Sequence, residues 1–352
     1  MRRLLAATII AAFASGVAAE PAPEWTLDRW VPPYEFATEA AKVNYSPLTR
    51  ASKPWKLCVL FPHLKDAYWV ATNYGVIAHA RRIGVTVDLF EAGGYGNIDK
   101  QRSQLDTCVK GGYDAILVGS VSFDGLTPAI VEAAKTKPIF ATVNQVLPAG
   151  LSGMAAVNWI DMGRSAGRYF AERFPKGRSR PVKIAWLPGP ETAGWVKLTD
   201  QGFREEIEGA AVEVVAIKYG DTGADVQLGL VQDVLEEYPD IDFIAGNAVA
   251  IEAAMALVRQ RGLKGKVGLV ADYFTPAIYR GIRRGIVAGA PTDSAALQGT
   301  LSVDQAVRFL EGNSAADHVG PIIFNVTAAN VRAFPRLQSL APPDFQPTYS
   351  VQ

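Results

Sequence analysis

Cysteine and histidine, two of the side chains that most often bind transition metals, are scarce in this sequence. Its 352 residues include two cysteines and three histidines. His63, His79 and His318 lie in unrelated segments, without an H-x-x-x-H spacing or the cysteine cluster that zinc sites use. The sequence therefore gives no support to a metal centre.

An excess of charge of one sign is also missing. The chain has 35 basic and 35 acidic side chains, which cancel, and no block of Lys and Arg. Attraction to nucleic acid needs a basic field or patch, so we expect no nucleic-acid partner.

Catalytic and cofactor motifs are absent as well. There is no G-x-S-x-G elbow, residues 189–197 lack the spacing of a phosphate loop, and the run Gly93-Gly94-Tyr95-Gly96 does not spell the dinucleotide fingerprint. Adjacent carboxylates such as Glu205 and Glu206 point apart on a helix. We expect a protein that is not an enzyme and binds no cofactor.

Long apolar runs are confined to the beginning of the chain. Arg2 and Arg3 precede an apolar run over residues 4–17, which ends in the small residues Ala18 and Ala19. The run is shorter than the roughly 18 to 20 apolar residues that span a bilayer. We therefore interpret residues 1–19 as a signal peptide cleaved after Ala19, in preference to an uncleaved anchor.

Strand-like and helix-like segments alternate through most of the remaining chain. The strand-like runs are largely apolar, which is typical of strands buried on both faces of a parallel sheet. After Trp159 the pattern restarts, and the length fits two domains of roughly 100 to 200 residues. The sequence predicts an α/β protein with two doubly wound lobes and a cleft between them.

The segments before and after this pattern are less regular. Residues 20–54 contain Trp25 and Trp30, which are poor residues for a disordered leader, so we expect an arm packed on the first lobe. Residues 335–352 are Pro-rich, and we expect a surface tail without regular structure.

The two cysteines lie in the first lobe, Cys58 in its first strand and Cys108 at the end of a helical stretch. In an oxidising compartment these two cysteines could form a structural disulfide. Two buried thiols are the alternative, and the sequence leaves both open.

Aromatic residues follow two neighbouring strands, where ligands of open α/β sheets bind. Asp66, Tyr68 and Trp69 come after residues 56–61, and Tyr95 follows the next strand on a Gly-rich turn. Aromatic faces attract cations, so these residues predict part of a cage for a cationic or methylated ligand.

These motifs resemble the TorT-like family of type I periplasmic binding proteins, the trimethylamine N-oxide sensing partners of TorS-type sensor histidine kinases. The resemblance rests on the runs Trp55-Lys-Leu-Cys58, Leu64-Lys-Asp66-Ala-Tyr68-Trp69, Asn73-Tyr74-Gly75, Glu91-Ala-Gly-Gly-Tyr95, Trp186-Leu-Pro-Gly-Pro190, Ala253-Ala-Met255 and Tyr279-Arg-Gly. It implies a periplasmic location and two lobes joined by a three-segment hinge, with crossings near residues 158–159, 272–273 and 318–321. The implied divisions are 20–54 for the arm, 55–157 plus 273–317 for lobe 1, 158–272 plus 318–334 for lobe 2, and 335–352 for the tail.

The resemblance also implies the ligand and its site. Tyr68, Trp69 and Tyr95 would form a cage for trimethylamine N-oxide with Trp159 and Tyr273 of the hinge. Asp66 would face the methylammonium end or hold a water. Trp195 could form a wall of the site from the second lobe, but we interpret it as packing or partner surface. The alternative function is a solute-binding protein that delivers a sugar or small quaternary amine to an ABC transporter.

Overall fold

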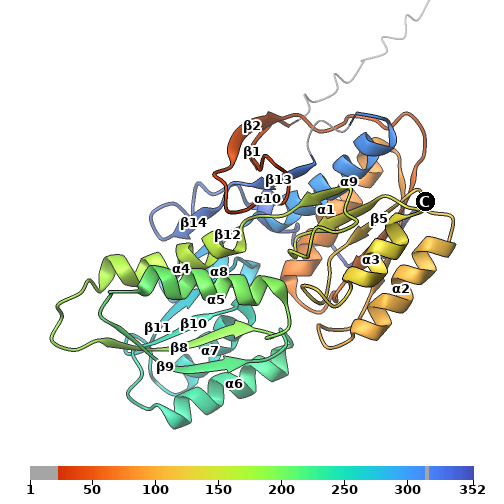
Figure 1. Cartoon of the computed structure of the whole chain (residues 1–352). Coiled ribbons are helices and arrows are strands. Elements are labelled where there is room, and N and C mark those ends of the chain that lie inside the picture. The colour runs from red at the N-terminus through yellow and green to blue at the C-terminus, as the bar shows by residue number, and fades with distance from the viewer. Residues whose placement is uncertain (1–22, 314–316) are drawn as a thin grey trace, which may run out of the picture.

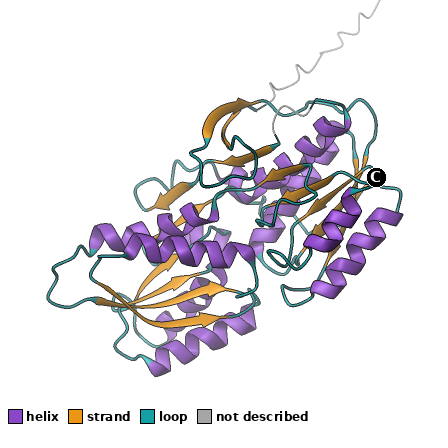
Figure 2. Cartoon of the chain, in the orientation of Figure 1, coloured by secondary structure: helices purple, strands orange, loops and turns teal. Residues whose placement is uncertain are grey.

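Two α/β lobes lie side by side in the computed structural model, as Figure 1 shows. The structure describes residues 23–313 and 317–352, so the expected signal peptide at residues 1–19 lies outside the described residues. Within the described part, no helix is long and apolar enough to cross a membrane. In each lobe helices cover both faces of a largely parallel sheet, as Figure 2 shows, which is the predicted doubly wound architecture.

Lobe 1 is built on a nine-stranded sheet in the order β15-β4-β3-β5-β6-β7-β13-β1-β2. Its six central strands are parallel and short, and most of their side chains are buried. They are β4 (Thr86–Glu91), β3 (Lys56–Phe61), β5 (Ala115–Val118), β6 (Ile139–Thr142), β7 (Gly153–Ala155) and β13 (His318–Pro321).

The helices of lobe 1 form two pairs. One pair is α1 (Ala67–Ile83) with α9 (Ala295–Leu310), and the other is α2 (Ile98–Lys110) with α3 (Thr127–Ala134). At Gly75 of α1 an added Cβ would lie 1.8 Å from the carbonyl oxygen of Ala296, so only glycine allows this approach to α9. A disulfide joins Cys58 of β3 to Cys108 of α2, with the Cα atoms 5.8 Å apart.

Lobe 2 is built on a four-stranded parallel sheet in the order β11-β10-β8-β9. The pair α4 and α5 packs against this sheet, and α6 and α7 form a second pair. The elements are α4 (Trp159–Arg173), β8 (Val182–Gly189), α5 (Gly194–Ile207), β9 (Val212–Tyr219), α6 (Ala224–Glu237), β10 (Phe243–Gly246), α7 (Ala248–Gln260), β11 (Gly268–Ala271) and α8 (Pro276–Arg283).

The crossings between the lobes differ from expectation, most clearly at the second one. The first lies between β7 and α4, as predicted, but the second does not lie near residues 272–273. There α8 packs against α7, and β12 (Gly289–Thr292) lies against β11 and pairs with β14 (Phe324–Thr327). The chain returns to lobe 1 only at Asp293 and Ser294, where Ser294 has a φ of 56°.

The third crossing follows β13, which pairs with β7 and β1 in the sheet of lobe 1. The expected divisions are therefore wrong in two respects, because residues 273–292 belong with lobe 2 and residues 318–321 with lobe 1. The sequence alone could not assign these two segments to a lobe, since short strands such as β12 and β13 fit either sheet equally well.

The arm and the tail both join the sheet of lobe 1. β1 (Trp25–Arg29) pairs with β13, and β2 (Ala41–Tyr45) pairs with β1. We expected a tail without regular structure, and this expectation is wrong in part. The tail forms α10 (Arg336–Ser339) and then β15 (Ser350–Val351), which pairs with β4. Since β14 lies in lobe 2 and α10 packs on α9, the chain passes between the lobes a fourth time near Pro335.

Candidate functional site

A small pocket lies between the two lobes, with an empty volume of about 260 Å³. Every residue that lines it follows the carboxyl end of a strand, where open α/β sheets bind ligands. Lobe 1 and the first crossing contribute Asp66, Tyr68, Trp69, Tyr95, Asn144 and Trp159, and lobe 2 contributes Trp195, Thr222 and Tyr273. The structure thus brings all six predicted residues together, while their role in ligand binding stays a prediction.

Asp66 has a structural role at the start of α1. It is the N-cap of this helix, and its Oδ1 accepts a hydrogen bond from the backbone N–H of Trp69 at 3.0 Å. A capping carboxylate satisfies a backbone donor that the first helical turn leaves free. The cap therefore fixes the turn that carries Tyr68 and Trp69.

Tyr68 connects the pocket to the second crossing. Its hydroxyl donates a hydrogen bond to Oδ2 of the buried Asp293, which also accepts from Gln298 at 2.6 Å. Burial raises the pKa of Asp293 to about 6, although these hydrogen bonds oppose the shift. Burial and the Asp293 carboxyl raise the pKa of Tyr68 well above its ordinary value, so its hydroxyl stays protonated.

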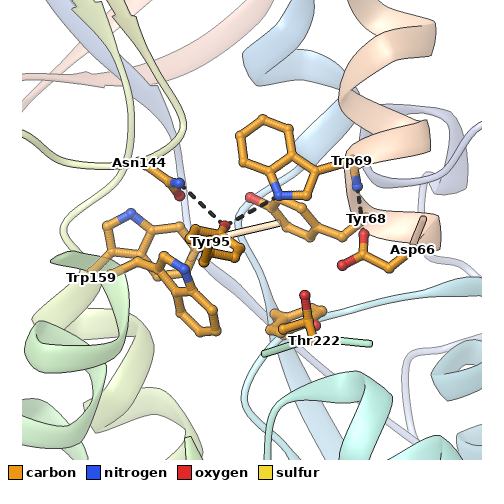
Figure 3. Close-up of a pocket in the computed structure, with 9 residues that line it drawn as sticks. Asp66, Tyr68, Trp69, Tyr95, Asn144, Trp159 and Thr222 are labelled. Atoms are coloured by element: carbon orange, nitrogen blue, oxygen red, sulfur yellow. Dashed lines mark hydrogen bonds between the residues drawn. The ribbon is translucent and has the colours of Figure 1, made fainter. Parts of the chain in front are cut away.

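Tyr95 lies at the centre of a hydrogen-bonded group, shown in Figure 3. Its hydroxyl oxygen accepts from the indole N–H of Trp69 and from the amide nitrogen of Asn144, both at 3.2 Å. The same amide nitrogen donates to the carbonyl of Ser120 at 2.7 Å, which fixes the orientation of the amide. Both lone pairs of the phenol oxygen are thus engaged, and its proton has no acceptor in the described protein.

Trp159 forms the wall at the first crossing. Asn158 caps α4, and the indole N–H of Trp159 donates to the carbonyl of Val143 at 3.0 Å. Val143 has a φ of 66°, which is strained for a β-branched residue and places the neighbouring Asn144 in the pocket. Trp159 therefore has no free donor and presents its ring to the pocket.

Trp195 and Tyr273 close the pocket from lobe 2. Trp195 lies 5.7 Å from Trp159 and 5.9 Å from Tyr273 between ring centroids, and Tyr273 lies 5.2 Å from Tyr68. The interpretation of Trp195 as packing or partner surface is wrong in that it lines the pocket. Its buried indole N–H makes no hydrogen bond of normal geometry, and it lies near enough to the Tyr95 hydroxyl to oppose the raised pKa of that phenol, so the two groups together offer donors to one ligand atom.

Sequence reasoning also missed Asn144 and Thr222. Each follows a strand by two or three residues, the same signal that located Tyr95, but polar residues are common in such turns and gave no separate hint. Position relative to a strand was therefore informative only where the residue type was unusual.

The electrostatics of the pocket are simple. Asp66 is the only charged residue that lines it, and six aromatic side chains surround the space. Burial raises the pKa of Tyr95 and of Tyr273 above the ordinary value, so both phenols are neutral. Among the described residues no group of His, Cys, Asp and Glu could hold a metal ion. Such a site suits a compact ligand with apolar or methylated surface, partial positive charge and one hydrogen-bond acceptor.

Two polar contacts join the lobes beside the pocket. The Lys65 ammonium and the Asp221 carboxylate are 2.8 Å apart, and the His63 ring and the Thr222 hydroxyl form a hydrogen bond of 3.1 Å. Lys65 and His63 precede α1 in lobe 1, whereas Asp221 and Thr222 follow β9 in lobe 2. The described conformation is therefore closed.

Two doubly wound lobes that close on a buried pocket define a ligand-binding protein of the periplasmic type. The family model for the periplasmic binding protein domain matches residues 57–314. Periplasmic protein TorT of Escherichia coli strain K12 is 38% identical over 326 residues, covering 92% of this chain and 91% of that protein. The chain belongs to the periplasmic binding protein domain family, and within it to the TorT-like proteins.

Solved structures agree with this membership. TorT in complex with the TorS sensor domain in the presence of trimethylamine N-oxide has a TM-score of 0.77 and 38% identity, covering 84% of this chain and 99% of that one. An ABC transporter solute binding protein from Bradyrhizobium sp. BTAi1 with bound bis-tris has a TM-score of 0.79 and 44% identity, covering 95% of this chain and 100% of that one.

Proposed function

We propose that this protein binds trimethylamine N-oxide, or a close methylamine, between its lobes and regulates a TorS-type sensor histidine kinase from the periplasm. The kinase would belong to a two-component system that controls trimethylamine N-oxide respiration. The observation that carries the proposal is the pocket itself, in which five aromatic rings surround a phenol whose proton has no protein acceptor.

The ligand chemistry matches this arrangement. Trimethylamine N-oxide has three methyl groups on a positively polarised nitrogen and one strongly basic oxygen. The ring faces attract the methylammonium end, each contributing on the order of 0.5 to 2 kcal/mol when desolvated. We assign the oxygen to the hydroxyl of Tyr95 and the indole N–H of Trp195, the two donors that make no other hydrogen bond of normal geometry.

The remaining polar residues have other partners. The hydroxyl of Tyr68 donates to Asp293, and the indole N–H groups of Trp69 and Trp159 donate to Tyr95 and Val143. In this proposal Asp66 faces the methylammonium end, because a carboxylate beside the oxide would repel it. In this proposal the protein acts by binding alone.

Ligand binding would act through closure of the lobes. A ligand shifts a conformational equilibrium only by its different affinity for the two shapes. The pocket has walls from both lobes, so trimethylamine N-oxide gains its full set of contacts in the closed form alone. The closed form would then be the one that the kinase distinguishes.

Isothermal titration calorimetry of the mature protein tests the proposal. We expect binding of trimethylamine N-oxide in preference to trimethylamine, glycine betaine and ribose, and loss of that binding in Trp69→Ala. Phe309→Ala is a matched control, because this ring is partly exposed and lies outside the pocket. Binding of ribose without binding of any methylamine would refute the proposal.

Transport is the second candidate, favoured by the 44% identical solute binding protein. Bis-tris, which that protein holds, is an amine with several hydroxyl groups. A larger amine or a sugar needs many hydrogen-bonding partners, whereas this pocket offers few free ones. Adding bis-tris to the calorimetric panel separates the two, since tighter binding of bis-tris than of trimethylamine N-oxide would favour transport.

A further inference from the structure

A groove outside the aromatic pocket joins the two lobes. It is lined by α8 of lobe 2, by the first turn of α1 in lobe 1, and by the tail from Arg336 to Phe345, and its empty volume is about 1160 Å³. Its bed is apolar, with Val70 of α1 and Leu340 and Phe345 of the tail among the residues that line it.

Arginines line the groove without carboxylate partners. The guanidinium carbons of Arg283 on α8 and Arg336 on the tail lie 5.6 and 5.4 Å from the ring centroid of Tyr279, so two cations converge on one ring. Arg280 also lines the groove, and its charge favours ionisation of the nearby Glu252. None of the three arginines takes part in an ion pair formed within the described residues.

This composition indicates what the groove would bind. All three arginines are exposed, and no acidic side chain lines the groove. A cluster of like charges is stabilised by a partner of the opposite sign, and arginine clusters are common recognition sites for acidic segments. The concave apolar bed suits an inserted segment with apolar side chains better than a flat membrane surface.

We infer that the groove between α8, α1 and the tail is the docking site for an acidic, partly apolar segment of a partner protein. The identity of the partner rests on the proposed function, which makes it the periplasmic sensor domain of the histidine kinase.

The groove and the aromatic pocket share structural elements in both lobes. Ala67 and Val70, which line it, are three residues apart on one face of α1, while Tyr68 and Trp69 on the same turn line the pocket. On the other side, Tyr273 of the pocket comes two residues before Thr275, the N-cap of α8. Movement of one lobe relative to the other therefore changes the groove and the pocket together, so partner and ligand affinities are coupled reciprocally.

A charge-reversal experiment tests the inference. The variant carries Arg283→Glu and Arg336→Glu. The control carries Lys176→Glu and Lys266→Glu, which change the net charge equally at exposed positions outside the groove. We measure affinity for the purified sensor domain by surface plasmon resonance, and affinity for trimethylamine N-oxide by calorimetry. The groove variant is expected to bind the sensor domain at least tenfold more weakly than the control, while both bind trimethylamine N-oxide within twofold of the wild-type protein.

The outcomes separate this inference from the proposed function. If the groove variant binds the sensor domain as tightly as the control while ligand binding is intact, the docking site is wrong and the ligand assignment stands. If the wild-type protein does not bind trimethylamine N-oxide, the proposed function fails by itself. If the wild-type protein binds anionic phospholipid vesicles through the two arginines and does not bind the sensor domain, the inference is overturned in favour of a membrane surface.

Discussion

The hydroxyl proton of Tyr95 offers the sharpest test of how the pocket recognises its ligand. Trp69 and Asn144 both donate to the phenol oxygen, so the free proton is available to an acceptor on the ligand. In Tyr95→Phe the ring stays and this donor is lost. We expect weaker binding of trimethylamine N-oxide with little change in affinity for ligands that lack the oxygen.

The magnitude follows from the hydrogen bond that is removed. A hydrogen bond to a charged group contributes about 1.5 to 3 kcal/mol, which corresponds to roughly a 10- to 150-fold change in dissociation constant. Tyr95 is only 5% exposed, so water does not readily replace the lost donor. Trp69 and Asn144 lose an acceptor in the free and the bound protein alike, so that loss largely cancels in the affinity.

Tetramethylammonium is the matched ligand for the assay, because a methyl group replaces the oxygen. Calorimetry should show that the wild-type protein prefers trimethylamine N-oxide and that Tyr95→Phe brings the ratio of the two affinities towards one. Tyr113→Phe is the control variant, since its hydroxyl bonds Asp88 far from the pocket lining. Equal losses for both ligands, or no loss for the N-oxide, would refute the assigned role of the hydroxyl.

Three further predictions concern closure and stability. Lys65→Ala should weaken ligand binding by no more than about fivefold, since pairs this exposed contribute about 0.2 to 1 kcal/mol, and exchange of Lys65 and Asp221 should restore it. Asp293 has a raised pKa of about 6 in the folded protein, so folding favours its protonated form. The free energy of unfolding should therefore fall as the pH rises from about 4 through 6. Urea denaturation should show a fall of about 3 kcal/mol in the free energy of unfolding of the wild-type protein and no such fall in Asp293→Asn. The same pH dependence in both proteins would contradict the prediction. Replacing Cys58 and Cys108 by Ala should lower stability by about 4 kcal/mol for a 50-residue separation, and dithiothreitol should then lower the melting temperature of the wild-type protein alone.

The sequence was informative where an unusual residue type coincided with a strand end. Aromatic residues directly after buried strands predicted Tyr68, Trp69 and Tyr95, because the ends of parallel strands meet at one edge of the sheet. The same rule applies to Trp195, which follows β8, but a tryptophan after a Pro-rich turn also fits simple packing. Asn144 was missed because its position depends on the positive φ of Val143, which no local sequence pattern predicts.

The fold was predictable in class but not in connectivity. Alternating apolar strands and helices predicted two doubly wound lobes, since that pattern buries each sheet on both faces. The second crossing depends on the pairing of β12 with β14, two strands more than thirty residues apart. Pairing at such a separation is decided by tertiary packing, so short apolar segments near residues 289–292 and 318–321 could not be assigned to a lobe in advance.

The connectivity gives a physical reason why binding in so small a pocket could affect a distant surface. The chain passes between the lobes four times, and the last passage leads into α10, where Arg336 contacts Tyr279 of α8 across the lobe boundary. The second passage contains Asp293, which accepts a hydrogen bond from Tyr68 of the pocket. Separation of the lobes must therefore disturb contacts at the pocket and at the tail together. A ligand that stabilises the closed pocket would then also fix the position of the tail relative to α8.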